Sequence, residues 1–255
     1  MTEPSPLSVL RESVEHLRLL AEQLDDAAIS RPAYPSEWTI AQVMSHLGSA
    51  AVINRKRLEL AAVGQDLPDD FAPPVWDAWN SKSPREQVDD GLTEDAALLD
   101  AFDAVTPEQR EQWSFSFGPL SVDLPGLVAF RLNEHVVHTW DVEVASDPAA
   151  TLLADGVPVL LDGMGLIVRW TARPTAGEAR AAHIVTHDPQ ARFAVSLTDD
   201  ASSLEPVAGD GDADLRLPAE ALVRLVYGRL DADHTPAFEG DASLLERLRA
   251  AFPGP

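Results

Sequence analysis

The spacing of apolar residues changes partway along this chain, and the change limits the folds it can adopt. In the first part, apolar residues recur every three or four positions, as at Leu7, Leu10, Val14 and Leu17, which is the period of an amphipathic helix. Later, the segments AHIVTHD and RFAVSLTD alternate apolar and polar residues, which is the period of a strand. We therefore expect a helical part followed by a part that contains a sheet.

Four long helices are predicted in the first part, over residues 5–28, 39–63, 83–105 and 125–145. Thr39 and Ser83 are the expected caps of the second and third helices. Residues 64–82 are rich in proline and are expected to form a loop or short turns, and the segment WSFSFGPLSVDLPG is expected to be irregular or extended. Helices of this kind form an up-and-down four-helix bundle.

The remainder of the chain is predicted to be a small α+β unit. A helix is expected over residues 156–171, followed by the two alternating strands, a third strand in ADLRLP and two further helices. We place the boundary near residue 148, which gives a helical bundle over 1–148 and an α+β unit over 149–255.

Composition excludes several classes of function. The formal net charge of −23 argues against nucleic acids and anionic membrane surfaces as partners. The chain has no Cys, so any thiol that takes part in its chemistry has to come from a cofactor. No segment approaches the about 18 apolar residues of a membrane span, and the N-terminus does not follow the pattern of a secretory signal. A cytoplasmic location is therefore expected.

The segment NEHVVHTWDVEVA places several metal-ligating side chains in the fourth predicted helix. Glu134 and His138 are four residues apart and share one helix face, whereas His135 lies about 100° away. If the second helix packs against the fourth, His46 can meet them. Two imidazoles and a carboxylate are a common ligand set for catalytic zinc, and iron, nickel and manganese accept similar donors. A Glu–His pair at this spacing is also a common hydrogen-bonded pair, so the spacing alone leaves both interpretations open.

The segments WTIAQVMSHLGSAAVINRKRLE and RLNEHVVHTWDVEVA resemble the mycothiol-dependent maleylpyruvate isomerase family, a branch of the DinB-like metal-binding four-helix bundles. The resemblance extends over the whole chain, and residues after about 150 are similar to the family's sterol-carrier-like C-terminal domain. It implies that His46, Glu134 and His138 hold a divalent metal, with zinc as the expected ion. It also implies that Asp141 orients His138, for which a surface salt bridge is the alternative, while His135 is structural.

In the family that the chain resembles, the reactive thiol belongs to mycothiol, which agrees with the absence of Cys. The resemblance implies that Arg229 binds or stabilises the substrate, with Arg224 as the second candidate. Two reactions fit: cis–trans isomerisation of a maleylpyruvate-like acid, and transfer of mycothiol to an electrophile. A metal-binding protein without catalytic turnover is the alternative from another class. The expected partners are mycothiol and a small electrophile, and the protein is expected to be a monomer or a homodimer.

Overall fold

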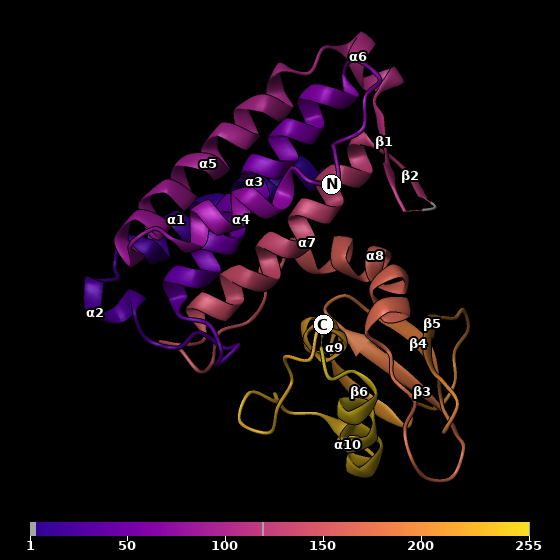
Figure 1. Cartoon of the computed structure of the whole chain (residues 1–255). Helices are drawn as coiled ribbons and strands as arrows, with labels where there is room; N and C mark the ends of the chain where they lie inside the picture. Colours follow the sequence, from indigo (N-terminus) through magenta and orange to yellow (C-terminus); the bar gives the residue numbers. More distant parts are fainter. Residues whose placement is uncertain (1–3, 119, 255) are drawn as a thin grey trace. The chain divides into compact units, whose positions relative to one another are not determined.

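The computed structural model describes residues 4–118 and 120–254, and it divides into two compact units, Met1–Asp147 and Pro148–Pro255 (Figure 1). The first unit is helical and the second combines a sheet with helices, so the expected α+β fold class is confirmed. None of the helices in the described ranges is long and apolar enough to cross a membrane.

The N-terminal unit is a bundle of four long helices with shorter elements between them. The long helices are α1 (Pro6–Ala21), α3 (Ile40–Ala61), α5 (Pro84–Ala104) and α7 (Leu124–Glu143). Thr39 and Gln42 form a capping box at the start of α3, and Ser83 and Glu86 form one at the start of α5. The shorter elements are α2 (Asp26–Ile29), α4 (Ala72–Asn80), α6 (Pro107–Gln112), β1 (Ser114–Phe117) and β2 (Leu120–Asp123).

Two segments in which no helix or strand was assigned from the sequence contain ordered elements. Residues 64–82 contain α4, whose prolines lie in its first turn, where a helix needs no backbone donor. Trp79 of α4 is buried and packs so close to Gly48 of α3 that a Cβ there would lie 2.3 Å from the indole ring. The segment expected to be irregular or extended forms the antiparallel hairpin β1–β2, which confirms the extended alternative. In α4, tertiary packing outweighs the local proline signal.

The order of the helices differs from that of a simple up-and-down bundle. Helix α1 packs against α7 and α5, and α3 packs against α5 and α7. Arg85 at the start of α5 binds Asp26 of α2, which directly precedes α3, at 2.7 Å. Trp113, just past α6, donates its indole N–H to the carbonyl of Leu58 near the end of α3 at 3.0 Å. Helices α3 and α5 therefore run parallel, which corrects the up-and-down expectation, because the long connection over residues 62–83 returns the chain to the end where α3 began.

The C-terminal unit has a five-stranded sheet in the order β5-β4-β3-β6-β7. Strands β3 and β6 are parallel and the other pairs are antiparallel. Apolar residues of α8, α9 and α10 pack with alternate strand residues in one core, for example Met164 with Ile184 and Leu222. The elements are α8 (Gly156–Thr171), β3 (Arg180–His187), β4 (Ala191–Leu197), β5 (Ser202–Pro206), β6 (Leu215–Pro218), α9 (Ala219–Val226), β7 (Glu239–Gly240) and α10 (Ala242–Ala251).

A buried polar network joins three of the long helices of the bundle. Asp95 of α5 forms an ion pair with Arg131 of α7, and its other oxygen lies 3.2 Å from Nε2 of His135. The Nδ1 atom of His135 lies 2.8 Å from the hydroxyl of Ser13 in α1 and 3.2 Å from that of Thr139. A charged pair in a bundle core is tolerated only when its members meet, so this network defines the rotation of α7 about its own axis.

The network makes stability depend on pH. Burial acts to raise the pKa of Asp95, but the neighbouring Arg131 and His135 outweigh it and lower that pKa. Burial lowers the pKa of His135, and the opposing effect of Asp95 does not offset it. Each group therefore binds a proton more readily in the unfolded chain than in the folded one. The free energy of unfolding should fall as pH drops below the ordinary histidine pKa of 6.5, and further below the ordinary aspartate pKa of 3.8.

We predict that His135 contributes a loss of stability between about pH 7.5 and about pH 5, which opposes the gain from His138, whose pKa is raised in the folded protein. In urea denaturation, His135→Gln should therefore shift the difference between the two pH values in favour of the acidic one, because glutamine does not titrate. An unchanged difference in the variant would assign the pH dependence to other groups.

Candidate metal centre

Two antiparallel helices bring together the three side chains that the sequence singled out. His46 projects from α3, and Glu134 and His138 project from α7. The Nε2 atom of His46 lies 3.1 Å from Oε2 of Glu134, and Nε2 of His138 lies 3.6 Å from the same oxygen. One ligand atom from each of the three residues falls within 4.8 Å of the others. These side chains can therefore point at one ion.

The cluster is open on one side and closed on the other. The side chain of Glu134 is 49% exposed and that of His46 is 33% exposed, whereas that of His138 is 12% exposed. A ligand set of two imidazoles and one carboxylate that faces solvent leaves coordination positions for a small molecule. The donor types and their convergence fit a divalent ion such as zinc, and no thiolate ligand is needed.

Asp141 holds His138 from the closed side. Its Oδ2 atom lies 2.8 Å from Nδ1 of His138, and its side chain is 0% exposed. The Asp141 carboxylate accepts a hydrogen bond from Nδ1–H of His138, which leaves Nε2, on the side of Glu134, as the ring atom that can bind an ion. The carboxylate is buried and not at the surface, and its orienting role for His138 stays a prediction.

The charges of the cluster support one another in the absence of an ion. Desolvation acts to raise the pKa of Glu134, but contacts with His138 and His46 hold that pKa well below its ordinary value. Burial acts to lower the pKa of His138, but its contacts with Asp141 and Glu134 raise it above the ordinary value. Glu134 is therefore an anion at neutral pH and ready to bind a cation.

Trp38 is part of the cluster, although the sequence analysis did not assign it there. Its ring stacks on His138 with a centroid distance of 6.1 Å and lies 5.3 Å from the ring of His46. The two imidazoles are themselves 4.7 Å apart. The available signal was its position directly before Thr39, the cap of α3, two helical turns from His46. Trp38 restrains both imidazole rings and supplies an apolar surface beside the ligands.

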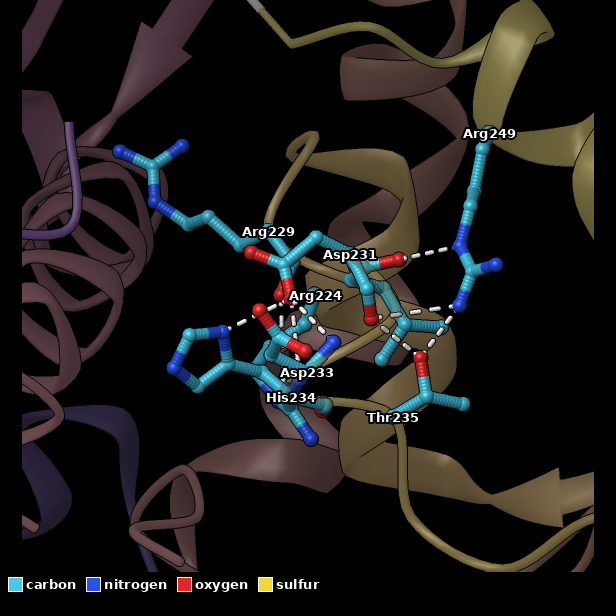
Figure 2. A network of polar contacts seen from close by, with 8 residues as sticks. Arg224, Arg229, Asp231, Asp233, His234, Thr235 and Arg249 are labelled. Carbon is cyan, nitrogen blue, oxygen red and sulfur yellow. Dashed lines mark hydrogen bonds and ion pairs between the residues drawn. The ribbon is translucent and has the colours of Figure 1, made fainter. Parts of the chain in front are cut away.

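In the C-terminal unit, Arg224 has a structural role in a loop. It binds both carboxylate oxygens of Glu220, at 2.7 and 2.8 Å, and donates to the carbonyl of His234 at 2.8 Å. Its side chain is 3% exposed. The bond to the carbonyl of His234 ties the end of α9 to the loop that follows it, and Figure 2 shows Arg224 within the polar network of this loop.

The same loop presents Arg229, the first candidate of the sequence analysis. Arg249 of α10 donates to the carbonyls of Leu230 and Asp231 at 2.6 and 3.2 Å and also bonds to Thr235. Figure 2 shows the side chain of Arg229 extending away from this network. Its Nη1 atom donates to the carbonyl of Tyr227 at 2.7 Å. Arg229 is itself buried, at 7% exposed, so the two candidate arginines differ in their partners and not in burial.

Comparison with known protein families identifies the family to which this chain belongs. The family model of the mycothiol maleylpyruvate isomerase N-terminal domain matches residues 10–143, which contain all three candidate ligands. The chain belongs to the mycothiol-dependent maleylpyruvate isomerase family. The model of the family's C-terminal domain matches residues 154–247.

Solved structures agree on the fold of this family member. A crystal structure of the mycothiol-dependent maleylpyruvate isomerase is 16% identical, with a TM-score of 0.62 and coverage of 89% of each chain. A structure of a point mutant of that enzyme gives the same identity and TM-score, with coverage of 88% of each chain. A comparison with curated protein sequences gave no significant match.

We predict that protein purified without added metal or an affinity tag contains about one divalent ion per chain, held by the three side chains. His138→Ala should lose the ion. Asp141→Asn should weaken binding by roughly 10- to 100-fold, because the imidazole loses its orienting partner. Elemental analysis and competition with a chelator measure both effects.

The control for this experiment is His183→Ala, which removes an exposed histidine of β3 and should leave metal content unchanged. Full occupancy in His138→Ala would contradict the assignment of the ligands.

Proposed function

We propose that this protein is a mycothiol-dependent enzyme that uses a divalent ion, with zinc as the expected one, to act on an electrophilic unsaturated acid. The observation that carries the proposal is the convergence of His46, Glu134 and His138 within 4.8 Å in a member of this family. An ion bound there supplies positive charge that favours the thiolate form of a nearby thiol at neutral pH. The chain has no Cys of its own, so the thiol has to be brought by mycothiol.

The reaction that we favour is cis–trans isomerisation of a maleylpyruvate-like acid. The thiolate of mycothiol adds to one carbon of the cis double bond, and the π electrons move to the conjugated carbonyl oxygen as an enolate. Rotation then occurs about what has become a single bond. Collapse of the enolate re-forms the double bond in its trans form and expels the thiolate, so the thiol is regenerated.

The protein's own residues have separate tasks in this proposal. Glu134 and the two histidines hold the ion, and Asp141 keeps the lone pair of His138 directed toward it. Trp38 beside the imidazoles gives the thiol an apolar wall that limits competing water. Arg229 is proposed to bind a substrate carboxylate, since a guanidinium matches a carboxylate in charge and shape.

Transfer of mycothiol to an electrophile is the alternative reaction at the same centre. It shares the addition step and differs in that the thiol stays on the product. A non-catalytic metal-binding protein is the third interpretation. The exposed side of Glu134 favours catalysis over it, because a purely structural ion is usually enclosed by four protein ligands.

The test is turnover of maleylpyruvate by the metal-loaded protein, with and without mycothiol, followed by absorbance of the enedione and by titration of free thiol. We expect turnover that requires mycothiol and leaves its concentration constant. Glu134→Gln should abolish it, and Arg229→Gln should raise KM by about tenfold or more, the scale of a hydrogen bond to a charged group.

Loss of free thiol together with a conjugate in the mass spectrum would replace isomerisation by S-transfer. Metal-loaded protein that turns over neither maleylpyruvate nor a panel of electrophiles would leave the non-catalytic interpretation. His183→Ala, on the exposed face of β3, should behave like the unmodified protein.

A further inference from the structure

Three consecutive cationic residues near the end of α3 differ in whether they form ion pairs. Arg55 pairs with Glu94 at 2.8 Å, and Lys56 pairs with Glu59 at 3.0 Å. For Arg57, no carboxylate lies within ion-pair distance among residues 4–118 and 120–254. The contrast is unexpected in a chain with 42 acidic and 19 basic residues.

The guanidinium of Arg57 is nevertheless held in place. Its Nη1 atom donates to Oδ1 of Asn54 at 2.6 Å, and its central carbon lies 4.8 Å from the centroid of the Phe115 ring. The side chain is partly buried, and this desolvation lowers the pKa of Arg57. A restrained guanidinium still has N–H donors in a fork that fits a carboxylate. A partly desolvated cation without a counter-ion also gains more from an anionic ligand than an exposed one does.

Arg57 lies on the same face of α3 as His46. The two residues are eleven positions apart, close to three full turns, which corresponds to about 16 Å along the helix axis. The hydrogen bond to Asn54 shows that the guanidinium folds back by about one turn toward His46. An extended seven-carbon dicarboxylate is about 9 Å long. A contact at each end adds to this length, so the bound acid would span a distance similar to the one between Arg57 and His46.

We propose that Arg57, with Asn54 beside it, forms a carboxylate-binding subsite that selects dicarboxylic acids over substrates with a single charge. The inference rests on the proposed function for what happens at the ligand cluster, but the subsite itself is carried by the contacts of Arg57. Arg57 supplies the cation for one of the two carboxylates of such an acid. A purely structural role, in which Arg57 fastens the β1–β2 hairpin to α3 through Phe115, is the competing explanation.

The test measures binding, so it does not depend on turnover. Calorimetry on the full-length, zinc-loaded protein compares heptanedioate with its monoethyl ester, and the readout is the ratio of the two dissociation constants. We expect the unmodified protein to prefer the diacid and Arg57→Gln to reduce that preference by about tenfold. Arg57→Lys should retain part of it, because the charge remains and the fork is lost. Arg55→Gln, which removes the neighbouring cation that is already paired, should keep the full preference.

Several outcomes would overturn the subsite. They are an unchanged ratio in Arg57→Gln, equal weakening of both ligands, and the absence of diacid preference in the unmodified protein. Equal weakening with a lowered melting temperature would establish the structural role instead.

The subsite and the proposed function can fail separately. Diacid preference that depends on Arg57, without thiol-dependent turnover, would support the subsite and reject the function. Thiol-dependent turnover with an unchanged ratio in Arg57→Gln would support the function and reject the subsite.

Discussion

The ion pair between Asp95 and Arg131 is the interaction on which the candidate centre depends. It lies in the bundle core with both side chains 1% exposed, where neither charge is tolerated alone. Because Arg131 faces Asp95, the neighbouring turns of α7 are fixed in rotation, and Glu134 and His138 face α3. A rotation of α7 by one residue would place Val137 or Thr139 where His138 now lies. The polar core thus determines which residues of α7 meet His46.

The sequence predicts the ligand cluster well because the relevant information is local. The four-residue spacing of Glu134 and His138 puts both on one face of any helix. To include His46 in the predicted cluster, we needed only the assumption that two helices pack together. The family resemblance then favoured a metal centre over an ordinary Glu–His pair. The separation of His135 from this cluster also follows from helical period, and the structure places His135 in the core network.

What the sequence did not predict depends on contacts between distant segments. The parallel run of α3 and α5 follows from the path of the connection between them, which no local pattern encodes. Trp38 precedes a helix cap, and only the packing of α7 brings its ring against His138. Helix α4 was not predicted because its prolines indicated a loop. Proline disrupts the middle of a helix but is compatible with the first turn, where the prolines of α4 lie. The sequence names Arg229 and Arg224 as candidates, and only the structure shows that Arg224 binds Glu220 and the carbonyl of His234 whereas Arg229 bonds to the carbonyl of Tyr227.

The distance along the chain between the candidate ligands has a further consequence. His46 and Glu134 are separated by 88 residues, so an ion that binds both closes a long loop and acts as a reversible cross-link between two helices. An ion that binds the folded chain better than the unfolded one stabilises it by mass action. Metal supply and folding would then share one equilibrium, and a cell short of the ion would lose this protein to unfolding and degradation as well as lose its activity.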